Sequence, residues 1–455
     1  MKQYPEMKDS SVKWLGCIPA HWGILRGKRF FYTQKIKNDG NTEKNILSLT
    51  LKGVIRNNAD KPIGLSPSDY STYQIFEKDD LVFKLIDLNN ISTSRVGLVP
   101  ERGIMSSAYI RLTARETCDI RYFYLFYYHL WLRNVYNGLG AGVRQTLNAE
   151  DLLNLDIIIP PQEEQSQIVR FLDWKVSEIS RLIANKNKTI ALLEEHLNTR
   201  IENLVLHGIQ SNNNAPTVSE FGFERAPLSW KIIQNKRLFS ERIEHSEDGS
   251  ETLLSVSKHY GVKRYSDLKQ DEQYATLKPA LSLVGYKKVE ENDLVMNIMR
   301  ARNGSYGISE YDGIVSPAYC IYSLKEPCNP KYIHYFMRTS RMKGYFEMSS
   351  RGIAEHRRRL YPDQFFQLFT LLPPVNEQNE IVDMIEKMNA EIENAISIIK
   401  HQVELLHELR IKIISDVVTG KIDVRGIEIP EYEYFSDTSE EETEDSGDEQ
   451  EVDEA

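Results

Sequence analysis

The feature that most constrains the fold of this chain is an internal repeat. The segment Pro160–Val169 recurs as Pro373–Val382, and both copies read P-P-x-x-E-Q-x-x-I-V. The offset is 213 residues, and six of the ten positions are identical. Self-similarity of this kind indicates one structural unit built twice. The fold must therefore meet the same packing requirements two times within one chain.

Shorter matches precede both copies in the same order. We interpret the chain as a tandem duplication of roughly 210 residues followed by a tail. Two modules that share a scaffold and bind different ligands would diverge between these matches, and so would two copies drifting neutrally. The matched pairs are Ile18–Trp22 with Ala226–Trp230, Lys28–Phe31 with Lys236–Phe239, Leu47–Leu49 with Leu254–Val256, Asp80–Val82 with Asp293–Val295, and Gly103–Tyr109 with Gly313–Tyr319.

Each Pro-Pro pair predicts the start of a long helix. Proline is tolerated in the first helical turn, and Glu163 and Glu164 lie where the helix dipole favours negative charge. Gly208 and Gly420 are the expected helix stops. Each helix of about 45 residues would span about 65–70 Å. Apolar residues recur at spacings of three and four, which predicts a coiled-coil seam: Ile168, Leu172, Ile179, Leu182, Ile190, Leu193, Leu197, Ile201 and Leu204, then Ile381, Ile385, Met388, Ile392, Ile399, Leu406, Ile413 and Val417.

The two helices are expected to pack antiparallel as a rigid spacer between two α+β modules. Short apolar runs at residues 80–86 and 293–298 have the length of strands. Aromatic-rich helices are expected at residues 122–132 and 332–338. The predicted domains are residues 1–158 and 213–371 for the modules, 159–212 and 372–425 for the helices, and 426–455 for a disordered acidic tail.

Charge is unevenly distributed along the chain. The net charge is −10, but residues 431–455 hold 13 acidic residues and no Lys or Arg, so residues 1–430 carry +3. Residues 20–158 carry +4 and residues 226–371 carry +5. Two weakly basic blocks therefore alternate with acidic segments, a pattern that permits nucleic-acid binding without demonstrating it.

Several functional classes find no support in the sequence. The start of the chain lacks a signal-peptide pattern, and no run approaches the ~18 apolar residues of a membrane helix, so a cytoplasmic location is expected. The four cysteines, at positions 17, 118, 320 and 328, form no metal-binding pattern and are expected to be reduced thiols. Neither G-x-x-x-x-G-K-[ST] nor H-E-x-x-H occurs, which argues against catalysis by the chain alone.

The paired arrangement resembles the specificity subunit of type I restriction-modification systems. It consists of an I-P-x-x-W start at Ile18–Trp22, a variable block, and the P-P-x-x-E-Q-x-x-I-V helix start, all repeated once over about residues 10–425. The second start, Ala226–Trp230, departs from the pattern at its first residue. The resemblance implies two target-recognition domains that each read one half of a bipartite double-stranded DNA sequence, with the helices setting the spacer.

The resemblance also implies partners and an absence of catalysis by this chain. Two modification (methyltransferase) subunits and, in a full complex, restriction (translocase-nuclease) subunits would dock on the helices and framework. S-adenosylmethionine, ATP and Mg²⁺ would be held by those partners, with no cofactor or metal on this chain. The residues expected to form the docking and spacer framework are Pro160, Pro161, Glu164, Gln165, Ile168, Pro373, Pro374, Glu377, Gln378 and Ile381.

The candidate DNA-binding residues lie in polar stretches between apolar runs. Basic side chains hold phosphates, and arginine or amide side chains read base edges. Each could instead be a solvated surface charge. Two rival hypotheses stay open: a coiled-coil protein scaffold, and a nucleic-acid enzyme with an unrecognised site. The candidates are Lys52, Arg56, Arg95, Arg144 and Gln145 in the first block, and Lys258, His259, Arg264, Arg300, Arg302, Asn303, His356, Arg357 and Arg358 in the second.

Overall fold

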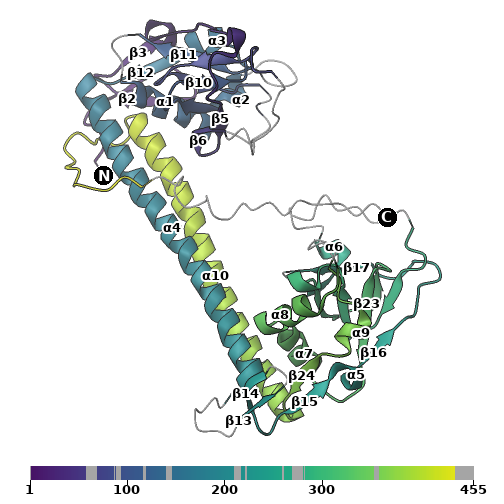
Figure 1. Ribbon diagram of the computed structural model, residues 1–455. Coiled ribbons are helices and arrows are strands. Elements are labelled where there is room, and N and C mark those ends of the chain that lie inside the picture. Colours follow the sequence, from purple (N-terminus) through teal and green to yellow (C-terminus); the bar gives the residue numbers. More distant parts are fainter. Residues whose placement is uncertain are drawn as a thin grey trace. The chain divides into compact units, whose positions relative to one another are not determined.

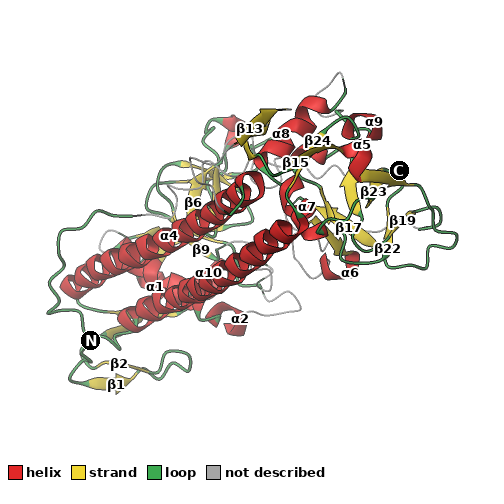
Figure 2. Ribbon diagram, turned by 90° about the horizontal axis from the view of Figure 1, so that it is seen from below, coloured by secondary structure: helices red, strands yellow, loops and turns green. Residues whose placement is uncertain are grey.

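The structure, a computed structural model, divides into two compact units. Unit 1 comprises residues 1–188 and 399–455, and unit 2 comprises residues 189–398. Figure 1 labels the elements and Figure 2 separates helices from strands. The structure describes all residues except 1, 58–68, 87, 89–93, 116–118, 140–145, 210–216, 221–222, 259–260, 269–279, 281, 353–357 and 436–455.

Unit 1 is built on a four-stranded antiparallel sheet in the order β4-β11-β8-β9, with smaller two-stranded sheets β1-β2, β12-β3, β5-β6 and β10-β7. The strands are β1 (Met7–Asp9), β2 (Cys17–Pro19), β3 (Gly23–Arg26), β4 (Phe31–Tyr32), β5 (Leu47–Thr50), β6 (Gly53–Arg56), β7 (Gln74–Phe76), β8 (Leu81–Phe83), β9 (Val96–Leu98), β10 (Gly103–Met105), β11 (Ile110–Ala114) and β12 (Asp156–Ile159). Its short helices are η1 (Gly27–Arg29), η2 (Asp39–Asn41), α1 (Ile120–Leu132), α2 (Val135–Leu139) and α3 (Ala149–Leu153).

Unit 2 repeats this strand order: β16-β23-β20-β21 forms the main sheet, and β13-β14, β15-β24, β17-β18 and β19-β22 form the smaller ones. The strands are β13 (Thr217–Glu220), β14 (Phe223–Pro227), β15 (Lys231–Gln234), β16 (Phe239–Arg242), β17 (Leu254–Ser257), β18 (Gly261–Arg264), β19 (Lys287–Val289), β20 (Leu294–Asn297), β21 (Tyr306–Ile308), β22 (Gly313–Val315), β23 (Tyr319–Leu324) and β24 (Phe369–Leu372). Its short helices are α5 (Asn235–Leu238), α6 (Tyr265–Leu268), η3 (Ala301–Asn303), α7 (Pro330–Met337), α8 (Ser340–Ser349) and α9 (Pro362–Phe365).

An aromatic helix covers the main sheet in each unit, as the sequence predicts. Asp119 caps α1 by accepting hydrogen bonds from two backbone N–H groups, and Asn329 caps α7 in the same way. Tyr122 and Tyr332 are completely buried, yet each hydroxyl donates to a carbonyl of the strand that precedes a long helix, Ile158 and Leu371 respectively. A buried tyrosine hydroxyl usually finds such a partner. These two bonds fix how each aromatic helix lies against the strand that precedes the long helix.

The two long helices are α4 (Gln162–His207) and α10 (Val375–Val418). In unit 1 the start of α4 and the end of α10 share one apolar core, which includes Ile168, Leu172, Ile414 and Val417. In unit 2 the end of α4 and the start of α10 share the other. The helices therefore run in opposite directions within each unit, as expected. Both expected glycine stops have positive φ, +79° at Gly208 and +73° at Gly420.

The repeated Glu-Gln pair has a structural explanation. The side-chain amides of Gln165 and Gln378 each donate over 2.8 Å to a proline carbonyl five residues earlier, Pro160 and Pro373. The carboxylates of Glu164 and Glu377 each accept a 3.0 Å hydrogen bond from a tryptophan indole N–H. Those indoles belong to Trp22 and Trp230, the tryptophans of the two repeat starts. Each helix start is thus bonded to the start of its own module.

The two copies of this contact differ in how much the carboxylate binds. Glu164 also accepts from the Tyr4 hydroxyl at 3.0 Å and lies 2.6 Å from His21 Nε2. Burial and the Glu164 charge raise the pKa of Tyr4 far above its usual range. Glu377 is half-buried, and its carboxylate accepts a hydrogen bond from the Trp230 indole N–H. The carboxylate of Glu164 therefore binds more partners than the carboxylate of Glu377 does.

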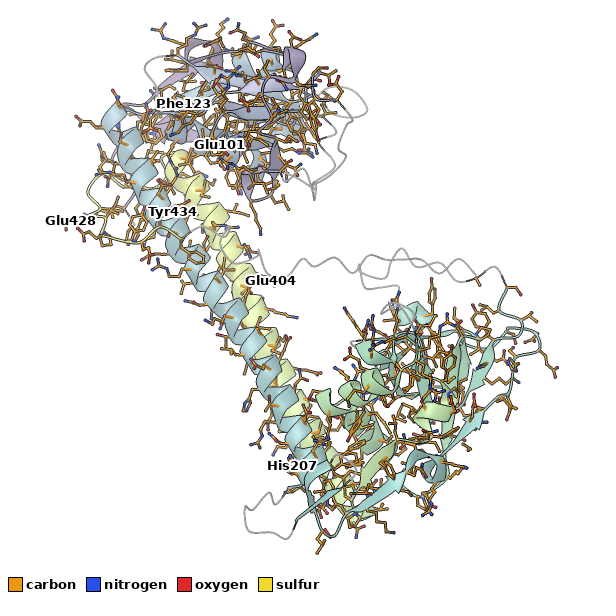
Figure 3. All side chains as sticks on the ribbon, in the orientation of Figure 1. Glu101, Phe123, His207, Glu404, Glu428 and Tyr434 are labelled. Carbon is orange, nitrogen blue, oxygen red and sulfur yellow. The ribbon has the colours of Figure 1, made fainter. Side chains whose placement is uncertain are left out.

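The C-terminal segment, residues 421–435, packs on unit 1. Gln167 donates to the carbonyls of Val424 and Ile427 at 3.0 and 2.8 Å, and Arg181 donates to the Glu433 carbonyl at 2.7 Å. Ile427 and Ile429 lie against the apolar core. Figure 3 shows Tyr434 beside α4. The prediction of disorder from residue 426 is therefore wrong for residues 426–435, because α4 side chains satisfy their backbone. Residues 436–455 lie outside the described residues.

Two further features concern composition. No helix in the described part of the chain is long and apolar enough to cross a membrane. Cys17, Cys320 and Cys328 are free thiols, and burial raises the pKa of Cys328 to about 11. Cys118 lies outside the described residues.

The unequal surroundings of Glu164 and Glu377 predict unequal effects of truncation. Glu164→Ala leaves the buried Tyr4 hydroxyl and Trp22 indole N–H without their acceptor, so the free energy of unfolding should fall by about 2–4 kcal/mol. Glu377→Ala removes one indole acceptor in a more exposed setting and should lower it by about 1 kcal/mol. Denaturant unfolding of the two matched variants measures the difference, and equal losses would contradict this explanation.

Candidate nucleic-acid interface

Each unit presents one exposed β-hairpin that carries predicted DNA-binding residues. In unit 1, β5 and β6 pair antiparallel, with Leu47 opposite Arg56. In unit 2, β17 and β18 pair in the same way, with Leu254 opposite Arg264. Lys52 and Lys258 are exposed in the turns that connect the two strands of each hairpin. Lys52 and Lys258 therefore occupy equivalent turns in the two units, and Arg56 and Arg264 occupy equivalent ends of the second strand.

The arginine at the end of each hairpin has a different neighbour. Arg56 forms a two-pronged ion pair with Glu101, while the guanidinium of Arg264 lies 4.4 Å from the ring centre of Tyr311. Glu101 and Tyr311 both follow the outer strand of the main sheet, β9 or β21. The carboxylate lowers the positive potential of Arg56, whereas the aromatic ring attracts the Arg264 guanidinium without neutralising its charge. The same scaffold thus displays two different surfaces.

A second exposed basic turn lies beside the hairpin of unit 2. It is formed by η3, where Arg300 and Asn303 are exposed and Arg302 is half-buried. A Cβ atom placed on Gly304 would lie 3.8 Å from the Lys258 carbonyl oxygen and 3.3 Å from Cε of Lys343. The hairpin turn, the η3 turn and the Lys343 side chain of α8 are therefore immediate neighbours. Burial lowers the pKa of Lys343, and the charge of Arg338 lowers it further.

Lys343 and Arg338 were missed by the sequence analysis. Both lie on helical segments, where a basic residue every few positions is the ordinary pattern of a solvated face. Only the folded chain brings them to the two turns. The signal that could have located them is the position of α7 and α8 directly after the last strand of the main sheet.

Arg95 was predicted to contact DNA, and the structure shows that this prediction is wrong. Its side chain is only 2% exposed, and its Nη1 donates to the Lys84 carbonyl at 3.5 Å. The polar sequence around it suggests a surface loop, but the residue directly precedes β9 and points into unit 1. A guanidinium enclosed in this way packs inside the module and is not displayed on its surface.

Five predicted contacts cannot be placed. Arg144, Gln145, His259, His356 and Arg357 lie outside the described residues. Arg358 is exposed. The backbones of Arg351 and Arg359 are joined by a pair of 2.9 Å hydrogen bonds. Leu360 then donates to the Ile298 carbonyl, so Arg358 and Arg359 leave the core close to the η3 turn.

The residues predicted as a docking and spacer framework are mostly enclosed. Pro160, Glu164, Gln165 and Ile168 are buried, and so are Pro373, Gln378 and Ile381. Pro161 and Pro374 are exposed, and Glu377 is half-buried. The buried side chains of this set hold each helix to its module. Docking of a partner at these positions stays a prediction.

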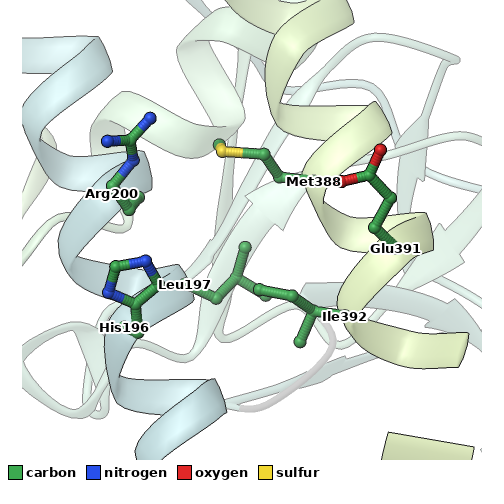
Figure 4. A pocket seen from close by; sticks show the side chains of 6 residues that line it. All are labelled: His196, Leu197, Arg200, Met388, Glu391 and Ile392. Atoms are coloured by element: carbon green, nitrogen blue, oxygen red, sulfur yellow. The ribbon is translucent and has the colours of Figure 1, made fainter. Parts of the chain in front are cut away.

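The helix pair of unit 2 contains a small hollow of about 210 Å³. Figure 4 shows Leu197 of α4 and Ile392 of α10 meeting at its centre, with His196, Arg200, Met388 and Glu391 around them. None of the predicted DNA-binding residues lines it. Within the described part of the chain, no group of three or more His, Cys, Asp or Glu side chains is arranged to hold a metal ion.

Comparison with known proteins finds relatives of one kind. Residues 24–192 match the family model for the type I restriction modification DNA specificity domain. The chain is 24% identical over 313 residues to the putative type I restriction enzyme MjaX specificity subunit of Methanocaldococcus jannaschii, covering 67% of this chain and 68% of that protein. It is 23% identical over 349 residues to the type I restriction enzyme MjaVIII specificity subunit of the same organism, covering 72% and 76%.

A solved structure shares the fold. Its description is "Structural basis underlying complex assembly and conformational transition of the type I R-M system", and its TM-score is 0.54 at 14% sequence identity, covering 89% of this chain and 99% of that chain. The resemblance inferred from the paired motifs is thus confirmed: the chain is similar to type I specificity subunits, and its residues 24–192 match the model of the type I restriction modification DNA specificity domain.

Proposed function

We propose that this chain is the DNA-specificity subunit of a type I restriction-modification complex and that each unit reads one half of a bipartite target. Basic side chains at the hairpins would contact phosphates, and nearby arginine and amide groups would read base edges. Half-sites on one face of DNA are separated by about 34 Å, which is one helical turn, or by a multiple of that distance. The pair α4 and α10 would act as an antiparallel coiled coil that sets this spacing.

The observation that carries the proposal is the matched pair Arg56–Glu101 and Arg264–Tyr311. Both arginines end the second strand of an exposed hairpin on the same strand order, yet one is neutralised by a carboxylate and the other stacks on a ring. A single binding function would favour two similar surfaces. Two half-sites of different sequence require a constant scaffold with different side chains on it, because specificity depends on the contacts and not on the fold.

Catalysis in this proposal belongs to the partners. Two modification subunits would carry S-adenosylmethionine and methylate adenine, and restriction subunits would carry ATP and Mg²⁺. This chain would recognise the target and provide the docking framework, with no cofactor or metal of its own. The rival proposal, a coiled-coil scaffold without a DNA role, makes the opposite prediction in both experiments below.

The first test is a base-resolution map of DNA methylation in the host with and without this gene. A split adenine-methylated motif should disappear on deletion and return on complementation. If the methylation pattern is unchanged while a partner modification subunit is expressed, the scaffold proposal replaces this one.

The second test concerns the basic turns of unit 2. The double variant Lys258→Ala with Arg300→Ala, in complex with the modification subunits, should bind target DNA more weakly at every salt concentration. Loss of two phosphate contacts should reduce the slope of log K against log salt by about 2. Lys331→Ala is the matched control, because its ammonium faces Glu386 of α10 at 3.5 Å. Identical slopes for the double variant and the control would exclude these turns from the interface.

A further inference from the structure

The hairpin and the η3 turn of unit 2 are joined by one arginine side chain. Arg338, the C-cap of α7, donates from Nη1 to the carbonyls of Gly304 and Tyr306 at 3.2 and 2.9 Å. Its Nη2 donates to the Lys258 carbonyl at 2.6 Å. The planar fork of a guanidinium can hold several carbonyls at fixed angles, which a lysine ammonium on its flexible stem cannot do as well.

The residue one helical turn earlier completes the same support. The imidazole of His334 lies beneath the hairpin, where Cβ atoms placed on Gly261 and Gly307 would come within 3.0 and 3.2 Å of its Cε1. Its Nδ1 accepts from the backbone N–H of Ile308 at 3.3 Å. Burial and the neighbouring cations lower the pKa of His334 to about 3, so the ring is neutral and can accept this bond. His334 and Arg338 together form a rigid base for the hairpin.

Unit 1 has a different residue at the position of Arg338. Tyr122 and Tyr332 occupy matching positions, which aligns Arg338 with Tyr128. Tyr128 packs against Tyr124 and Trp131 in an aromatic cluster. The hairpin of unit 1 is seated by Leu49 and Val54, whose methyl groups would each lie 2.6 Å from a Cβ placed on Gly97 of β9. The hairpin of unit 2 also packs apolar side chains into its module, and its turn is in addition bonded through the Lys258 carbonyl to Arg338.

We propose that Arg338 is a positioning residue for target reading by unit 2: it fixes the Lys258 turn relative to the Arg300–Asn303 turn, so that the exposed side chains of both turns meet the same half-site in one register. The inference rests on the proposed function. Recognition groups need to be held within about 0.5 Å of their productive geometry by supporting residues. The three carbonyl bonds of Arg338 supply that support between two turns far apart in sequence.

The test uses the intact chain with its partners in the host, and the readout is the methylated motif. In Arg338→Met, one half of the split motif should become degenerate, with discrimination against wrong bases falling about 5-fold to 100-fold at the affected positions, the value of a good base contact. The other half and the spacing should stay unchanged. Arg338→Lys should give an intermediate loss, and Lys331→Met on the same helix should give none.

The outcomes separate positioning from simple stability. A general loss of folding would lower methylation at all sites without relaxing the sequence, so thermal unfolding of each variant is recorded alongside. If Arg338→Met does not fold, Arg338→Lys decides. A fully specific motif in the folded variant, or equal relaxation of both halves, overturns the proposal. If no motif depends on the unaltered chain, the proposed function itself has failed, which is a different result.

Discussion

The carboxylate of Glu164, buried at the first turn of α4, is the contact on which the rest of unit 1 depends. It accepts from Trp22 and Tyr4 and faces His21, so the N-terminal strands, the module and the helix meet at one group. The end of α10 closes against the same place, where a Cβ atom on Gly420 would lie 2.3 Å from Pro19 and 3.0 Å from Trp22. A buried carboxylate without these partners would be strongly destabilising.

The same arrangement in unit 2 shows why the motif is repeated. Glu377 binds Trp230, and a Cβ atom on Gly208, at the end of α4, would lie 3.0 Å from the same tryptophan and 2.9 Å from Glu377. Each tryptophan is thus covered by the end of the helix that begins at the other module. The repeated residues make up this junction, while the residues between them, on the hairpins and turns, can change without disturbing it. The residues that the two copies share at this junction are therefore separate, along the sequence, from the surface residues in which the copies differ.

Much of the fold could be predicted because it depends on local signals. The proline pairs, glycine stops and apolar spacing located both long helices, and the aromatic runs located α1 and α7. The role of Glu164 and Glu377 could not be predicted, since it depends on a tryptophan about 140 residues away. Arg95 was misplaced because a polar sequence does not reveal burial. The order of residues 426–435 was missed because their acidic and aromatic composition conceals backbone bonds to α4. Arg338 was missed because its partners are carbonyls, which carry no side-chain signature.

Two independent readers on one scaffold should be separable, and an exchange of modules tests this most directly. Residues 20–158 would be replaced with the corresponding block of a related subunit that has a different target and a tryptophan at the position of Trp22, so that the bond to Glu164 is kept and the helices stay unchanged. The methylated motif of the host would then be mapped at base resolution. We expect one half of the motif to change while the other half and the spacing persist. A simultaneous change of both halves would contradict it.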